Sequence, residues 1–259
     1  MTTQSIKTEK IRSVFTVTGK KFLTPHFIRV FFNIDELQAD LLTHVKSGSN
    51  NKLFIPAEPL LSSGGKEIQT ETAVITRTYT NRKIDLENRE LSVDFVAHGE
   101  SGPASAWALK AAPGDTLTIG MKQSSRPLVP DADFYLFIGD ATALPVICAI
   151  VEELPSYVTA KVLLEVYGKE DEMMLCSAAD VSVEWLHNED PEKGSRLADV
   201  VKNMELPGGI LKKYIYAAAE YSTVKEVKDY FKTDLNWDPQ GMYACSYWKS
   251  GQSEDGGPH

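Results

Sequence analysis

The chain has 259 residues, enough for one large domain or for two domains that each bury a core. Its composition, 42% hydrophobic and 24% charged residues, is typical of a globular protein and excludes a disordered chain. A formal net charge of −9 argues against nucleic-acid binding, so any anion site must be formed by local positive charge.

Several sequence features bear on the location of the protein. No apolar run reaches the roughly 18 to 20 residues of a transmembrane helix, which predicts no membrane insertion. The polar start, MTTQSIKTEKIRSVF, lacks the apolar segment of a secretory signal, so we expect a cytoplasmic protein. Cys148, Cys176 and Cys245 lack disulfide or metal-ligand spacing, so we expect reduced thiols and no metal site.

The first half of the chain alternates apolar and polar residues in short segments separated by turn formers such as SGSNN and PGD. This pattern predicts a six-stranded antiparallel barrel domain over residues 1–125. The segment NIDELQADLLTHV has apolar residues at helical spacing and predicts a short helix between strands. The expected strands are 14–19, 26–32, 51–55, 73–84, 91–97 and 116–119.

From about Pro130 onward, strands alternate with helices. This alternation predicts a parallel sheet covered on both faces, a Rossmann-like nucleotide domain over residues 126–250. The polar tail 251–259 is expected to be flexible. The expected strands are 133–140, 160–167, 181–187, 212–220 and 241–248, and the expected helices are 141–154, 195–204 and 222–235.

The stretch Arg77-Thr78-Tyr79-Thr80 combines groups that suit a flavin nucleotide. A guanidinium binds phosphate through two hydrogen bonds, an aromatic ring stacks on a flat heterocycle, and a hydroxyl can bond to a ring nitrogen. In a strand, Arg77 and Tyr79 share one face. A surface arginine and a half-buried tyrosine without any ligand fit the same stretch, so both interpretations stay open at this point.

Two further segments place turns before helices. In HGESGPAS, a helix that begins near Pro103 presents free backbone N–H groups, with Ser105 in its first turn, and such a helix start binds pyrophosphate. Ordinary helix capping explains these residues equally well.

In LFIGDATALPV, a buried strand ends at Gly139-Asp140 and Thr142 follows. This is not a GxGxxG motif, but its position predicts contact with a dinucleotide.

The order of these motifs closely resembles that of siderophore-interacting proteins, a family of the ferredoxin-NADP reductase-like superfamily. The resemblance covers residues 14–251 and is most specific from His98 to Pro145. The motifs are Arg-x-Tyr-Thr, His-Gly-x-x-Gly-Pro-Ala-Ser-x-Trp, Pro-Gly-Asp, Pro-Asp-Ala-Asp-x-Tyr-Leu-x-x-Gly-Asp-x-Thr-Ala-Leu-Pro, Glu-Glu-Leu-Pro and Tyr-Trp-Lys-x-Gly.

The resemblance implies a cytoplasmic, monomeric ferric-siderophore reductase that carries FAD. Electrons would come from NADH, NADPH or a ferredoxin and pass to iron held by a catecholate or hydroxamate siderophore. No catalytic side chain beyond the flavin and no protein metal ligand would be needed. Two alternatives are a general NAD(P)H-flavin reductase and a siderophore-binding module without turnover.

The resemblance also implies roles for individual residues. Arg77 would hold the FAD phosphate, Tyr79 would stack on the flavin ring and Thr80 would bond near its reactive nitrogen. Further FAD contacts would come from Thr78, His98, Gly99, Gly102, Pro103, Ala104, Ser105 and Trp248. The nicotinamide nucleotide would contact Gly139, Asp140, Thr142, Ala143 and Glu220.

An anionic ferric catecholate needs a local cationic pocket in an acidic protein. We expect Lys52, Arg126 and Lys249 to converge on the open face of the flavin, although each fits a solvated surface charge as well. Lys169 and Glu170 follow the second strand of the nucleotide half, where a base favours NADPH and an acid favours NADH. The sequence therefore leaves the electron donor open.

Overall fold

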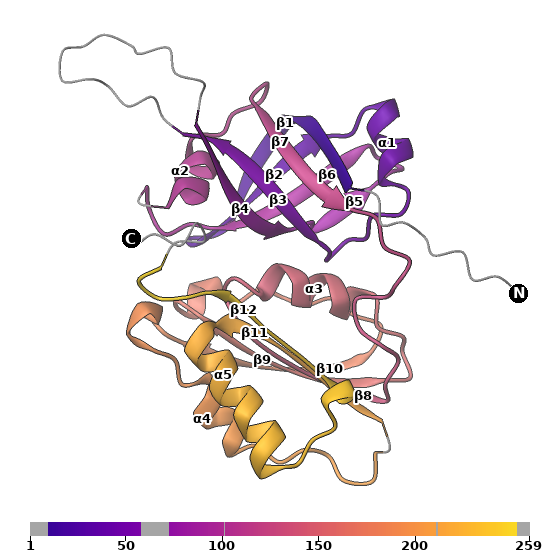
Figure 1. Cartoon of the computed structure of the whole chain (residues 1–259), viewed down its shortest axis with the longest axis vertical. Coiled ribbons are helices and arrows are strands. Elements are labelled where there is room, and N and C mark those ends of the chain that lie inside the picture. The colour runs from indigo at the N-terminus through magenta and orange to yellow at the C-terminus, as the bar shows by residue number, and fades with distance from the viewer. Residues whose placement is uncertain (1–9, 58–72, 101, 211, 253–259) are drawn as a thin grey trace, which may run out of the picture. The chain divides into compact units, whose positions relative to one another are not determined.

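The computed structural model describes residues 10–57, 73–100, 102–210 and 212–252. The chain divides into two compact units, one made of Met1–Leu23 and Phe27–Arg126 and the other of Thr24–His26 and Pro127–His259. Figure 1 shows an antiparallel sheet in the first unit and a parallel sheet in the second. Of the tail that we expected to be flexible, residues 253–259 lie outside the described residues.

The first unit is built on a curled antiparallel sheet with strand order β4-β3-β7-β1-β2-β6-β5. Its concave side is filled by one apolar cluster that includes Phe15, Phe32, Leu53 and Phe95. The edge strand β4 also contacts β6, so the sheet curls back on itself. The strands are β1 (Lys10–Thr24), β2 (Phe27–Asn33), β3 (Asn50–Pro56), β4 (Val74–Thr80), β5 (Lys83–Asp85), β6 (Glu90–Val96) and β7 (Thr116–Lys122).

The sheet has seven strands, whereas the sequence led us to expect six, because the expected strand 73–84 is broken. Up to Thr80 the segment pairs with β3, and from Lys83 it pairs with β6. At the corner, the buried side chain of Asn81 accepts a hydrogen bond from Asn51 at 2.8 Å and donates to the Ser49 hydroxyl at 3.0 Å. These bonds hold the bend, so one predicted strand becomes β4 and β5.

Two helices complete the described part of the first unit, α1 (Glu36–Leu42) and α2 (Pro103–Lys110). Asp35 caps α1: its carboxylate accepts from the Gln38 N–H at 2.8 Å, and the Gln38 side chain accepts from the Asp35 N–H at 2.9 Å. The predicted helix between strands is therefore present. Ala104 and Ala108 on α2 pack into the core of the sheet.

The second unit has a five-stranded parallel sheet with strand order β10-β9-β8-β11-β12. From β8 the chain adds β9 and β10 on one side, then crosses back to add β11 and β12 on the other. The topological switch point, where ligands bind in such sheets, therefore lies between the carboxyl ends of β8 and β11. The strands are β8 (Phe134–Asp140), β9 (Thr159–Val166), β10 (Asp180–His187), β11 (Lys213–Glu220) and β12 (Met242–Trp248).

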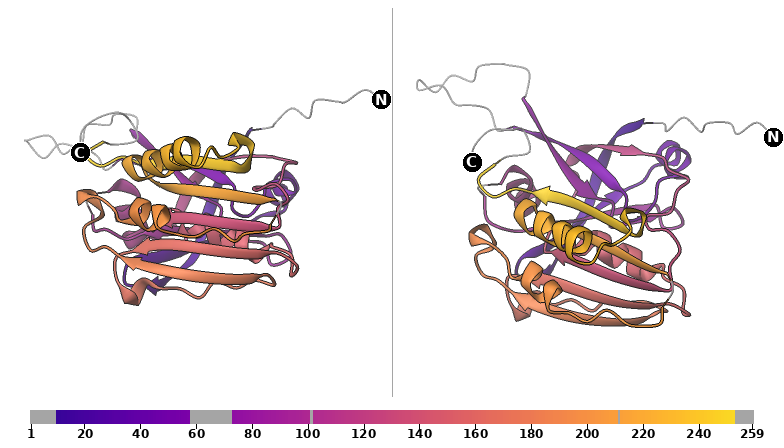
Figure 2. Two further views of the ribbon diagram at one scale, coloured as in Figure 1. Left: turned by 90° about the horizontal axis from the view of Figure 1, so that it is seen from below. Right: turned by 60° about the horizontal axis from the view of Figure 1, so that its bottom comes forward.

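Helices cover both faces of this sheet, as the alternation of strands and helices predicts (Figure 2). On one face, α4 (Leu197–Lys202) and α5 (Tyr221–Asp229) enclose an apolar cluster with β8, β9 and β11. On the other face, α3 (Leu144–Glu152) packs on β8 through Ile147. Shorter turns are 3-10 helical at Lys169–Asp171, Pro191–Lys193 and Pro239–Gly241, and a π-helical turn, Tyr230–Asp234, extends α5.

Within the described part of the chain, no helix combines the length and the apolar composition needed to cross a membrane.

Candidate functional site

Arg77 and Tyr79 lie on the same face of β4, opposite Leu53 and Asn51 of β3. The Tyr79 ring packs against the core, with its centroid 4.7 Å from that of Phe95. The Arg77 guanidinium donates to the Thr76 carbonyl at 2.9 Å. The core therefore supports the Tyr79 ring on one side, and the Arg77 side chain lies on the same face of β4 as this ring.

Lys52 and Thr78 pair across β3 and β4 on the other face of these strands. The Lys52 ammonium donates a hydrogen bond to the Thr78 hydroxyl. Thr80, at the end of β4, is buried. Among the residues that we nominated on β3 and β4, the structure therefore brings Arg77 together with Tyr79, and Lys52 together with Thr78.

The turn before α2 is fixed by Ser105. Its hydroxyl donates to the Gly99 carbonyl at 2.6 Å and accepts from the His98 N–H at 3.2 Å, and the side chain is buried. Gly99 has a φ of +86°, which favours glycine, and a Cβ on Gly102 would lie 2.3 Å from Cε1 of His98. Ser105 therefore shapes the turn from inside, while His98 packs directly over Gly102.

Gly102 occupies the N-cap position of α2 and Pro103 the next, and among the described residues no side chain caps this helix start. Backbone N–H groups at an uncapped helix start bind anions such as phosphate. An FAD requires an aromatic ring to stack on, a guanidinium for its phosphate and free N–H groups for its pyrophosphate. Tyr79, Arg77 and the start of α2 provide these groups, so the first unit fits this cofactor.

Asp140, the last residue of β8, connects this strand to the turn that follows it and to the ends of β11 and β12. Its carboxylate accepts four hydrogen bonds, from the Thr142 N–H at 2.9 Å, the Thr142 hydroxyl at 2.6 Å, the Glu220 N–H at 2.9 Å and the Trp248 indole at 2.7 Å. Burial raises the pKa of Asp140, while these donors act to lower it. The carboxylate thus stabilises the switch point itself, and its contact with a nucleotide stays a prediction.

Glu220 and Gly139 also have structural roles. The Glu220 carboxylate caps α5 through the Ser222 and Thr223 N–H groups and accepts from the Ser250 N–H at 3.3 Å. Burial alone would raise the pKa of Glu220, but a hydrogen bond from the Ser222 hydroxyl and these backbone hydrogen bonds bring it below its usual value. A Cβ on Gly139 would lie 2.8 Å from that of Ala143, which is fully buried, so this glycine lets α3 approach β8.

The three nominated cations have different surroundings. Lys52 bonds to Thr78, as described, and Arg126 lies on the surface after β7, where its N–H donates to the Ser124 hydroxyl at 3.2 Å. Lys249 follows Trp248 and lies 5.0 Å above the centroid of the Tyr221 ring. Lys52 and Arg126 belong to the first unit and Lys249 belongs to the second, and their convergence on one ligand stays a prediction.

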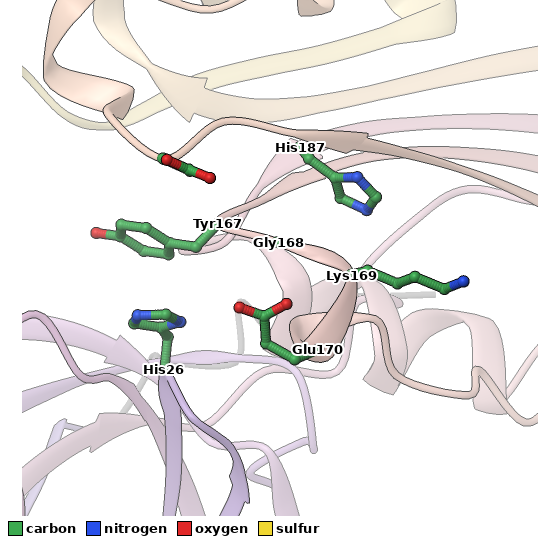
Figure 3. Close-up of a pocket in the computed structure, with 7 residues that line it drawn as sticks. His26, Tyr167, Gly168, Lys169, Glu170 and His187 are labelled. Carbon is green, nitrogen blue, oxygen red and sulfur yellow. The ribbon is translucent and has the colours of Figure 1, made fainter.

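A pocket of about 410 Å³ lies in the second unit at the carboxyl ends of β9 and β10 (Figure 3). His26 and Tyr167 form one wall, with their rings stacked at a centroid distance of 4.5 Å. The pocket is lined by His26, Tyr167, Gly168, Lys169, Glu170, His187 and Glu189.

Sequence reasoning singled out only Lys169 and Glu170 of this pocket. His26 joins the pocket from a segment 145 residues away from Asp171, whose buried carboxylate holds it. The third strand of the second unit, β10, gives a signal that could have found more of the lining, because His187 ends this strand and Glu189 follows it, much as Lys169 and Glu170 follow β9.

The described residues contain no group of three or more His, Cys, Asp or Glu side chains that could hold a metal ion.

The chain can now be placed in a class of proteins. Ferredoxin-NADP+ reductase from Plasmodium falciparum has the same fold: it is 14% identical, with a TM-score of 0.66 over 91% of this chain and 96% of the other. The family model for the siderophore-interacting FAD-binding domain matches residues 16–124. The chain is a flavin-dependent oxidoreductase with a ferredoxin-reductase-like fold, and FAD is its cofactor.

A second family model, siderophore-interacting protein, matches residues 132–251, so the two models together span both units. The chain belongs to the siderophore-interacting protein family. It is 29% identical to the ferric vibriobactin reductase ViuB of Vibrio cholerae over 91% of this chain and 89% of that protein. It is also similar to the siderophore-interacting protein SipS from Aeromonas hydrophila, with 29% identity, a TM-score of 0.77 and 94% of each chain covered.

Proposed function

We propose that this protein reduces the Fe(III) of a ferric siderophore to Fe(II) and so releases the iron. The arrangement of Arg77, Tyr79 and the uncapped start of α2 in one FAD-binding unit carries this proposal. The similarity to a ferric vibriobactin reductase supports the choice of substrate. Fe(II) is a softer ion than Fe(III) and is bound far less tightly by hard oxygen ligands, so reduction weakens the chelate.

In this proposal the side chains bind and orient, and they perform no covalent chemistry. Bound FAD supplies the ability to take two electrons together and to release them one at a time. Arg77 holds a phosphate group of the cofactor, Tyr79 provides the stacking surface, and the N–H groups at the start of α2 bind the pyrophosphate. One hydride from a nicotinamide nucleotide supplies two electrons, enough to reduce two ferric chelates.

The donor and the location belong to the proposal as well. The parallel sheet and its switch point support a nicotinamide nucleotide as the donor. A ferredoxin donor, the cytoplasmic location and the monomeric state stay predictions from the sequence.

An anaerobic titration tests the proposed reaction. The FAD-loaded protein is reduced with dithionite, freed of excess reductant, and mixed with a ferric catecholate in the presence of a ferrous trap. We expect the flavin absorbance band to return in step with two trapped Fe(II) ions per FAD, because each FAD releases two electrons. A flavin that stays reduced with bound chelate would indicate a binding module. Reoxidation by free flavin but not by the chelate would indicate a general flavin reductase.

The substrate pocket can be tested through Lys249. Its ammonium lies over the Tyr221 ring, which restricts its position without neutralising its charge. We expect Lys249→Ala to weaken binding of an anionic ferric catecholate about fivefold at low salt, a loss that higher ionic strength reduces. Binding of a neutral ferric hydroxamate should change by less than about twofold. Flavin fluorescence quenching gives both dissociation constants.

Lys228→Ala is the matched control for this prediction, because it removes one exposed lysine from α5 of the same unit. It should leave both dissociation constants unchanged. Equal losses for catecholate and hydroxamate in the Lys249 variant would remove Lys249 from the charge-selective pocket.

A further inference from the structure

The pocket at the carboxyl ends of β9 and β10 has a fixed wall. The buried carboxylate of Asp171 lies 2.7 Å from Nδ1 of His26 and accepts from the Thr24 hydroxyl at 2.6 Å. His26 is thereby held against Tyr167, and the two rings, inclined by 21°, form a flat surface. The volume of about 410 Å³ is within the range of small-molecule sites and large enough for a nucleoside.

The two loops that border the pocket are acidic. The loop after β9, residues 168–172, has one lysine and three carboxylates, and so does the loop after β10, residues 188–193. The lysine of the second loop, Lys193, is already paired with Asp190 at 2.6 Å. Burial raises the pKa of the Tyr167 hydroxyl, and four nearby carboxylates raise it further, in keeping with a negative potential around this ring.

Within the first loop, Glu170 and Lys169 both line the pocket, but their side chains point in different directions. Figure 3 shows the Glu170 carboxylate turned toward His26, while the Lys169 side chain extends away from it. The Glu170 carboxylate folds over the backbone of Gly168, where an added Cβ would lie 2.8 Å from Oε2. Gly168 therefore gives the carboxylate its place in the pocket.

The second loop is anchored from β9. The Glu165 carboxylate is buried and accepts from the Asn188 amide at 3.0 Å and from the Ser195 hydroxyl at 2.9 Å. Glu189, next to Asn188, lines the pocket from this anchored loop. Two carboxylates thus border the same space from two loops.

We infer that this pocket binds the adenosine end of the electron donor and selects a free ribose 2'-hydroxyl, so that the donor is NADH in preference to NADPH. The inference rests on the proposed use of a nicotinamide nucleotide. A 2'-hydroxyl donates a hydrogen bond to a carboxylate at the end of the second strand of such a sheet. A 2'-phosphate at the same place meets Glu170 and Glu189 with the same sign of charge and is repelled.

Binding of nucleotide fragments tests this without any electron transfer. Adenosine 5'-phosphate and adenosine 2',5'-bisphosphate are titrated into the oxidised, FAD-loaded full chain by calorimetry, followed by NADH and NADPH. We expect the 2'-hydroxyl form of each pair to bind at least about tenfold more tightly, because like charges oppose the phosphate. The double variant Glu170→Lys/Glu189→Gln should reverse this ratio.

Glu153→Lys is the control, because it adds positive charge on an exposed residue after α3 and outside the pocket. It should keep the wild-type ratio. The inference would be overturned by equal affinity for both forms, by tighter binding of the 2'-phosphate form or by no binding of either. The same reversal of the ratio in the control variant would overturn it as well. Because the siderophore titration uses protein reduced by dithionite, its result does not depend on nucleotide binding and can fail or succeed independently.

Discussion

Replacing Asp140 by asparagine should lower the free energy of unfolding by about 2 to 3 kcal/mol, the cost of a buried donor left without an acceptor. The carboxylate accepts four hydrogen bonds, whereas an asparagine side chain has a single oxygen and a donating amide group. Whichever way the amide is turned, at least one N–H of Thr142, Glu220 or Trp248 then faces another donor.

Urea denaturation of the FAD-loaded chain, followed by circular dichroism, measures this loss. Asp238→Asn is the matched control: Asp238 is exposed and accepts only from the Gln240 N–H, at 2.9 Å, and asparagine serves equally well at such a helix start. The control should stay within about 0.5 kcal/mol of the wild type. If Asp140→Asn keeps full stability but loses NADH affinity, Asp140 is a nucleotide ligand rather than a structural residue.

The second large effect is expected at Arg77. Arg77→Ala should weaken FAD binding about 10- to 100-fold, because a hydrogen-bonded ion pair with phosphate is lost. The protein should then lose most of its yellow colour on gel filtration, and the ratio of flavin to protein absorbance measures this directly. The fold should persist, since Arg77 is only half-buried.

Arg12→Ala is the control for Arg77. Arg12 is an exposed arginine of β1 whose guanidinium lies 3.8 Å above the centroid of the Phe54 ring. It makes a comparable surface interaction on a strand that is not adjacent to β4. Its flavin content should match that of the wild type. Full flavin content in the Arg77 variant would remove Arg77 from the phosphate role.

The fold was largely predictable from the sequence, because the spacing of apolar residues along a segment indicates which of its side chains are buried. Alternation in the first half and strand-helix alternation in the second predicted both sheets. The seventh strand was not predictable, because the corner at Asn81 depends on a hydrogen bond to Asn51, thirty residues earlier. The stretch 73–84 contains no glycine or proline, so it gives no strong local sign that the chain changes its pairing partner there.

The candidate site was predictable where chemistry and secondary structure coincide. The strand period alone places Arg77 and Tyr79 on one face. The internal use of Asp140 was hidden, because two of its three partner residues lie 80 and 108 residues further along the chain. The wall formed by His26 and Tyr167 was hidden for the same reason, since stacking of two distant rings leaves no pattern in the sequence.

The hydrogen bonds of Asp140 have a consequence for how the chain is made. The Trp248 indole comes from β12, so a nascent chain cannot complete this network until the residues up to Trp248 have left the ribosome. Until then, the end of β8 must remain hydrated or be shielded by a chaperone, because burying a carboxylate without its donors is costly. The second unit therefore acquires its final packing only after β12 has emerged, more than 100 residues later than β8.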